Sequence, residues 1–213
     1  MLTFKNIFFL FIFYSIVGWA LEVIYTLFTD HKLVNRGFLI GPYCPIYGFG
    51  CVLITILLWG SKEDFPGLFL KSVLICSVLE YFTSYLMEKM FKYRWWDYSN
   101  KRFNINGRIC LETMVPFGLG ACLIDRIINP FLFKILGYMN NTLSTVLFIV
   151  LLTIVLVDAV FSIIFVSKIS KVQKNTKVDT TEELKAKMIE FITSGRTFYK
   201  RIFDSFPDLK RSK

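Results

Sequence analysis

Charged side chains within long apolar stretches are the residues of this chain that could do chemistry. Glu22, Arg36, Arg108 and Glu112 lie inside such stretches or at their ends. A charge inside a bilayer costs about 2.5–3.5 kcal/mol on insertion scales, so it usually has a role. We interpret these four residues as ligand-binding candidates in a polar cavity, where they bind a charged ligand or relay protons. The alternative is internal ion pairing, Glu22 with Arg108 and Glu112 with Arg36, which holds helices together and binds nothing.

Three further acidic residues also fall inside apolar stretches. Glu80 and Asp158 lie near the middle of theirs. Glu88 stands beside Lys89 nearer an end, and we expect it to reach the membrane interface along its own apolar stem.

Other kinds of chemistry have little support in the sequence. His31 is the single histidine, so there is no imidazole cluster for a metal or a nucleophilic triad. The five cysteines have no CxxC spacing, which indicates neither a zinc site nor a redox pair. No P-loop motif is present for ATP. We therefore predict no catalytic residue, metal or cofactor, and we rank an enzyme below a non-enzymatic membrane protein.

Membrane-spanning helices are the elements that must position these residues. Of the 213 residues, 54% are hydrophobic and 19% are charged, against about 25% charged in ordinary soluble domains. A helix needs about 20 mostly apolar residues to cross a membrane. Five stretches qualify: residues 7–29, 38–60, 66–91, 109–128 and 143–167. We predict an all-α integral membrane protein with a transmembrane domain over residues 1–168 and a basic cytoplasmic tail over residues 169–213.

The distribution of Lys and Arg predicts the orientation of these spans. If the C-terminus is cytoplasmic, 20 basic residues lie on the inner side and 5 on the outer side. Positive residues favour the cytoplasmic side. We therefore predict the N-terminus outside, the C-terminus inside and a polar cavity that faces the cytoplasm. The net charge of +9 is explained by basic segments beside anionic lipid head groups, so nucleic acid is not an expected partner.

Helix breakers interrupt two of the five predicted spans. Residues 41–50 contain two prolines and three glycines, and residues 115–120 contain one proline and two glycines. Backbone groups freed at membrane depth must bond to protein or to water in a cavity. We expect the first stretch to be buried in the bundle or to line a pocket. Asn129 and Pro130 predict the end of the fourth span, with a short interfacial segment over residues 131–138.

Two segments outside the spans carry informative patterns. Residues 92–104 mix Trp and Tyr with basic residues, which predicts an aromatic belt at the head-group level or a docking element for a partner. In the tail, Thr180 and Glu183 fit a capping box. Apolar residues then recur on one face: Leu184, Met188, Phe191, Phe198 and Ile202. We predict an amphipathic helical tail on the membrane surface or against another subunit, for example in a homo-oligomer.

Several short motifs, taken in order, resemble one bacterial family. They are Gly18-Trp19 with Glu22, Asn35-Arg36-Gly37-Phe38-Leu39, Gly41-Pro42, Pro45-Ile46-Tyr47-Gly48, Arg94-Trp95-Trp96-Asp97-Tyr98-Ser99 and Asn106-Gly107-Arg108. This set, spread over residues 1–167, resembles the bacterial ABC-transporter permease (type IV) membrane protein family. The resemblance implies an integral protein of the cell membrane and a permease subunit. Because the chain has no ATP-binding motif, its ATPase would be a separate protein.

The sequence leaves three hypotheses for function. The leading one is a transporter component whose cytoplasm-facing cavity takes an anionic lipid or a small anionic ligand. The second is an enzyme for a lipid-linked or phosphorylated substrate at the inner leaflet, in which Arg36 and Arg108 hold phosphate and Glu22 or Glu112 is the acid or base. The third is a non-catalytic assembly subunit that works through its tail.

Overall fold

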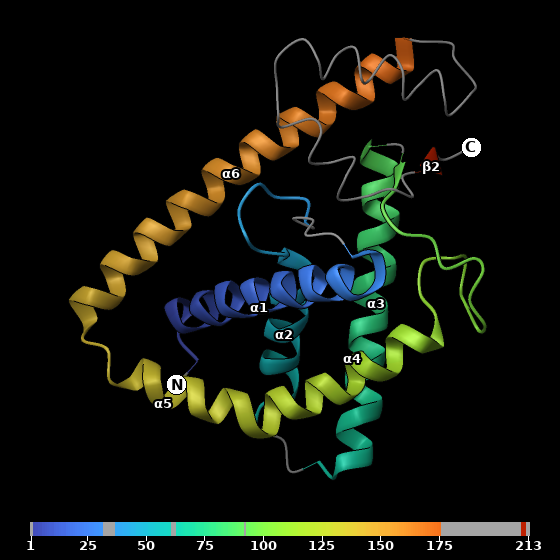
Figure 1. Cartoon of the computed structure of the whole chain (residues 1–213). Coiled ribbons are helices and arrows are strands. Elements are labelled where there is room, and N and C mark those ends of the chain that lie inside the picture. The colour runs from blue at the N-terminus through green and yellow to red at the C-terminus, as the bar shows by residue number, and fades with distance from the viewer. Residues whose placement is uncertain (1, 32–36, 61–62, 92, 176–209, 212–213) are drawn as a thin grey trace.

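Helices form nearly all of the regular structure of the protein (Figure 1). The computed structural model describes residues 2–31, 37–60, 63–91, 93–175 and 210–211. The helices are α1 (Phe4–Asp30), α2 (Pro45–Leu58), α3 (Phe65–Phe91), α4 (Leu111–Leu123), the π-helix η1 (Ile124–Ile128), α5 (Asn129–Gly137) and α6 (Asn141–Asn175). The two-residue strands β1 (Tyr93–Arg94) and β2 (Lys210–Arg211) pair antiparallel. The predicted all-α class is confirmed.

Three helices are long and apolar enough to cross a membrane. They cover Phe4–Thr29, Phe65–Phe91 and Asn141–Ile164, which correspond to the first, third and fifth predicted spans. Their large apolar side chains are widely exposed, as a surface that faces lipid requires. The second predicted span is shorter than expected, because α2 has 14 residues rather than the roughly 20 that cross a bilayer.

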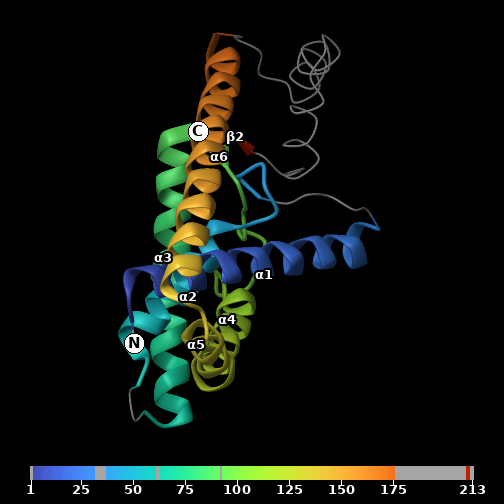
Figure 2. The same cartoon turned by 90° about the vertical axis from the view of Figure 1, so that its left-hand side faces the viewer.

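The long helices do not lie side by side as a parallel bundle. Figures 1 and 2 show α1 running across the direction of α3, while α3 and α6 end at the same end of the molecule. Helices that cross steeply touch over a short distance, so the residues at the crossing point decide how closely they approach. Small residues are therefore expected wherever α1 meets a neighbour.

Gly48 is the small residue at the contact between α2 and α1. A Cβ atom placed on Gly48 would lie 2.6 Å from the Phe11 carbonyl oxygen and 2.7 Å from the Phe11 ring. At the start of α2, the Cys44 N–H donates to the Ser15 carbonyl of α1 at 2.8 Å. Close backbone approach of this kind is how membrane helices gain packing energy without a hydrophobic driving force between them.

Replacing Gly48 with Ala is expected to push α1 and α2 apart. Overpacking of this kind costs about 2 kcal/mol, or roughly 4–8 °C in the melting temperature of a chain of this size. The melting temperature in detergent checks this. Gly120→Ala is the matched control: a Cβ there meets nothing within 4 Å, so it should keep or raise stability, because Ala favours helix by about 1 kcal/mol. Equal effects of the two substitutions would contradict the close contact.

The fourth predicted span continues past Asn129 and Pro130, so the predicted break at this point is wrong. The helix runs from α4 through η1 into α5, and the Asn129 N–H bonds to the Ile124 carbonyl, five residues back. This wider turn comes just before Pro130, which has no N–H to donate. The Asn129 side chain is fully buried and joins three helices, because it accepts from Tyr14 Oη of α1 at 2.7 Å and donates to Thr55 Oγ1 of α2 at 2.9 Å.

The aromatic and basic segment after α3 is folded against the helices. Trp95 is buried and packs with Phe91, Val166 and Phe38. The Trp96 indole N–H donates to the Arg108 carbonyl at 3.0 Å. The Trp95 ring thus packs within the protein and the Trp96 indole is hydrogen-bonded within it. The aromatic belt and the docking element stay predictions.

The predicted amphipathic tail helix lies outside the described residues, as does Arg36. The helix α6 continues past residue 168 to Asn175. The division into a membrane domain and a tail stays a prediction.

Candidate functional site

The first part of the second predicted span is partly buried but not helical. Residues 37–44 form bends and extended backbone, and α2 begins only at Pro45. Pro42 and Pro45 have no N–H and cannot continue a regular helix through this stretch. Leu39, Tyr43 and Cys44 are nevertheless buried, at 4%, 7% and 7% exposed. The expected burial of residues 41–50 is met in part, because Pro42 and Phe49 are exposed. The non-helical stretch leaves backbone donors that need partners.

Asp158 of α6 supplies partners for this interrupted segment. Its carboxylate accepts from the Ile40 N–H at 2.9 Å and from the Gly41 N–H at 2.7 Å. It also accepts from the Tyr43 hydroxyl and, at 2.9 Å, from Ser162 Oγ of its own helix. With four donors the buried carboxylate is well solvated by protein, as an ion at membrane depth must be. Asp158 therefore anchors a non-helical segment to α6.

Two carboxylates and two tyrosines come together beside this anchor, in a group that we call the acid–tyrosine cluster. In this cluster Tyr47, in the first turn of α2, donates to Glu22 Oε1 of α1 at 2.6 Å. The Tyr98 side chain hydrogen-bonds Glu80 of α3. The charges of Glu22 and Glu80 interact with each other. The acid–tyrosine cluster thus brings together polar side chains from three helices and one connecting segment.

Tyr98 is presented by the segment between β1 and α4. Its N–H donates to the Gly107 carbonyl at 2.7 Å. Gly107 has a φ of +68°, and a Cβ there would lie 2.6 Å from Asp97 Oδ1, so this turn requires glycine. Burial raises the pKa of Tyr98 above its usual range, and the hydrogen bond to Glu80 adds to this rise. The phenol therefore stays protonated and acts as a donor.

Arg108 lies in a second group, the guanidinium cluster, formed by Glu88, Arg94 and Arg108. Arg108 Nη2 lies 2.6 Å from Glu88 Oε2, and Arg94 Nε lies 3.1 Å from the same oxygen. The Arg108 guanidinium carbon is 5.6 Å from the Tyr81 ring centroid and 5.5 Å from that of Tyr85. The Glu88 side chain is 12% exposed, and one such carboxylate shared by two arginines with aromatic rings alongside is a strongly paired arrangement.

Of the four candidate residues from the sequence, Glu22, Arg108 and Glu112 are described by the structure, and these three lie in different places. Glu22 is in the acid–tyrosine cluster and Arg108 in the guanidinium cluster. Glu112 is at the surface, where its side chain is 57% exposed and pairs with Lys101 Nζ at 2.7 Å. This hydrogen bond, with the carboxylate charge, raises the pKa of Lys101. The suggested pair of Glu22 with Arg108 is not formed, because Glu22 bonds to Tyr47 and Arg108 pairs with Glu88. Glu112 pairs with Lys101, and its suggested pair with Arg36 lies outside the described residues.

Two residues have roles that the sequence interpretation did not assign. Asp158 holds the interrupted segment, and nothing in the sequence indicates which backbone it meets. Glu88 is the centre of the guanidinium cluster rather than a side chain at the interface. Its role had a detectable signal, because Tyr81, Tyr85 and Glu88 recur at spacings of four and three on one face of α3.

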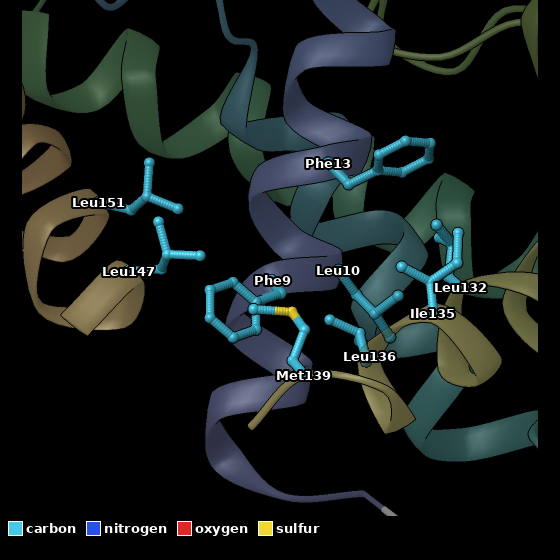
Figure 3. Close-up of a pocket in the computed structure, with 9 residues that line it drawn as sticks. All are labelled: Phe9, Leu10, Phe13, Leu132, Ile135, Leu136, Met139, Leu147 and Leu151. Atoms are coloured by element: carbon cyan, nitrogen blue, oxygen red, sulfur yellow. The ribbon is translucent and has the colours of Figure 1, made fainter. Parts of the chain in front are cut away.

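An apolar groove lies apart from both polar clusters, between α1, α5 and α6 (Figure 3). Its volume is about 220 Å³. The lining residues are all apolar: Phe9, Leu10, Phe13, Leu132, Ile135, Leu136, Met139, Leu147 and Leu151. It lacks the charged groups expected of the polar cavity.

Comparison with known proteins gives one match. A family model described as "Putative ABC-transporter type IV" matches residues 9–163. No curated protein and no solved structure matches the chain. The matched range takes in the interrupted segment, Asp158 and both polar clusters. With most of its length matched and three helices able to span a membrane, the chain belongs to the ABC-transporter type IV family.

Proposed function

We propose that this membrane protein is the permease subunit of an ABC-type transporter and works with a separate ATPase. The observation that carries the proposal is the interrupted second span, whose non-helical residues 37–44 are partly buried and donate two backbone N–H groups to Asp158. Transporters commonly build their substrate sites from discontinuous helices, whose unwound backbone and helix ends face the substrate. A chain meant only to anchor or to assemble has no need to place broken backbone among its helices.

The position of the acid–tyrosine cluster supports this proposal. Its Tyr47 lies in the first turn of α2, directly after the interruption, and bonds to Glu22. Acidic residues inside spans commonly mark substrate or ion pathways. We place the polar cavity expected from the sequence at this cluster, with Glu22 in its wall. In the predicted orientation it opens toward the cytoplasm of a cell membrane.

The enzyme hypothesis finds less support among the described residues. It requires Arg108 to hold phosphate, but this guanidinium is 8% exposed at the residue level and already meets Glu88 and Ser84 Oγ. A phosphate would have to displace Glu88. An anionic ligand at Arg108 would likewise have to displace Glu88.

Purification of the full chain from membranes of its source cells, followed by ATP hydrolysis measurements in lipid nanodiscs, tests the permease proposal. We expect a nucleotide-hydrolysing subunit to stay bound, and its ATP turnover to change at least about threefold with Asp158→Asn, because product release and conformational steps set many turnover rates. Thr153→Val, an exposed site on the same helix, is the matched control and should leave turnover unchanged.

Two results would contradict the permease proposal. Turnover of a labelled phospholipid by the chain alone, lost in Arg108→Gln, would favour the enzyme. A chain that purifies without any ATP-hydrolysing subunit, while its tail binds a second copy, would favour the assembly subunit. Reporter fusions at the C-terminus and between Glu63 and Phe65 check the orientation, with the first expected inside and the second outside.

A further inference from the structure

Glu80 is a buried carboxyl group that has fewer hydrogen-bond partners than an ionised carboxylate needs. The residue is 5% exposed in the middle of α3. One of its oxygens accepts a hydrogen bond from the Tyr98 phenol. The other, Oε2, has no hydrogen-bond partner within the described part of the chain. An ionised carboxylate offers about four acceptor positions and is costly to bury unless most are filled.

Asp158 in the same protein shows how many hydrogen-bond donors surround a carboxylate that is suited to carry a charge. It accepts four hydrogen bonds, two of them from backbone N–H groups. Among the described residues, the Tyr98 phenol is the one donor given for Glu80. Within the described ranges no Lys or Arg pairs with Glu80. The two buried acids therefore have opposite environments, although both lie inside long apolar helices.

The groups around Glu80 also disfavour a negative charge there. Tyr98 faces it from the segment after β1, Glu22 from α1 and Cys76 from one turn earlier on α3. Tyr47 connects to the group through Glu22. None of these groups carries positive charge, and Glu22 would repel a second carboxylate. Like charges in one low-dielectric site are relieved when one of them takes up a proton.

We propose that Glu80 is a proton-binding site, with the proton on Oε2 at neutral pH and Glu22 as the neighbouring carboxyl group. The Oε2–H bond forms when a proton is taken up and breaks when it is released. The charge of the acid–tyrosine cluster then changes by one. The proposal does not depend on the permease assignment, because proton occupancy can be measured without transport.

Infrared spectroscopy of the full chain in phosphatidylcholine nanodiscs tests this proposal. A protonated carboxyl group gives a C=O stretching band that a carboxylate lacks, and the band shifts in D₂O. We expect the band at pH 7 in the wild type and its absence in Glu80→Gln. Glu112→Gln is the control, because that side chain is exposed and paired with Lys101, and it should leave the band unchanged. Tyr98→Phe removes the donor to the ionised form, so the band should persist to a pH at least about one unit higher.

Thermal stability gives a second readout. Gln has the shape and neutrality of a protonated Glu, so Glu80→Gln should melt within about 2 °C of the wild type, since a substitution that keeps shape and charge changes little. The proposal is overturned if no band at pH 7 depends on Glu80, or if Glu80→Gln fails to fold. Sodium or potassium raising the melting temperature of the wild type but not of Glu80→Gln would also overturn it, in favour of a metal cation as occupant.

Discussion

Asp158→Asn should lower the melting temperature of the protein in detergent by about 8–16 °C, which corresponds to roughly 4 kcal/mol at this chain length. The amide keeps one acceptor oxygen and turns an NH₂ group toward a donor. The N–H groups of Ile40 and Gly41 and the Tyr43 hydroxyl then compete for that oxygen. Each buried donor left without a partner costs about 1–3 kcal/mol. Differential scanning fluorimetry measures the shift.

Thr153→Val on the same helix is the matched control for this loss. Thr153 is exposed and bonds only to the Ile149 carbonyl of its own helix, so its replacement should change the melting temperature by less than about 2 °C, as is usual for exposed sites. Maleimide labelling mapped by mass spectrometry adds a local readout. Cys44, 7% exposed at the end of the interrupted segment, should react faster in Asp158→Asn. Unchanged melting and unchanged labelling would show that Asp158 does not hold residues 37–44.

Arg108→Gln is expected to lower the free energy of unfolding by about 3–5 kcal/mol, because the largely buried Glu88 then keeps only Arg94 of its two arginine partners. Glu88→Gln should cost a similar amount, since it leaves Arg108 between Tyr81 and Tyr85 without a counter-charge. The double variant should be milder than the sum of the two. The coupling energy from a double-mutant cycle is expected at about 2–3 kcal/mol, as for contacting residues in one network.

The exposed pair of Lys101 and Glu112 is the control for this cycle. Its N–O distance of 2.7 Å is close to the 2.6 Å between Arg108 and Glu88. Both of its side chains are more than half exposed, and exposed pairs are worth about 0–1 kcal/mol. The two ion pairs therefore have similar N–O distances but different burial, so a difference between their coupling energies reports the effect of burial. Similar coupling energies for the two pairs would contradict the view of the guanidinium cluster as a buried structural unit.

Hydropathy and length were enough to find the three long helices. The predicted stretches 7–29, 66–91 and 143–167 overlap α1, α3 and α6 almost entirely. These helices are lined with apolar residues that face outward, so their signal depends on composition alone. The break in the second span was also predictable, because Pro42 and Pro45 remove two donors whatever the tertiary structure.

The hydrogen-bond and ion-pair partners of the charged residues could not be predicted in the same way. Glu22 and Arg108 lie at comparable ends of their spans, yet a steep crossing of α1 over α2 brings Glu22 to Tyr47 instead. The predicted end at Asn129 failed for a similar reason. A buried side chain bonded to Tyr14 and Thr55 holds the helix together through a π-turn. Such contacts join residues far apart in the sequence, and single-chain patterns do not report them.

Hydrogen exchange at the Ile40 and Gly41 amides tests most directly whether the interrupted span, on which the permease proposal rests, is anchored at Asp158. The full chain in lipid nanodiscs would be exchanged into D₂O and fragmented to resolve single amides. Protection of both amides close to that of helical amides in α3, lost in Asp158→Asn, is the predicted result. Exchange in the wild type as fast as in the exposed turn at residues 99–103 would contradict the anchor and remove the main support for a permease.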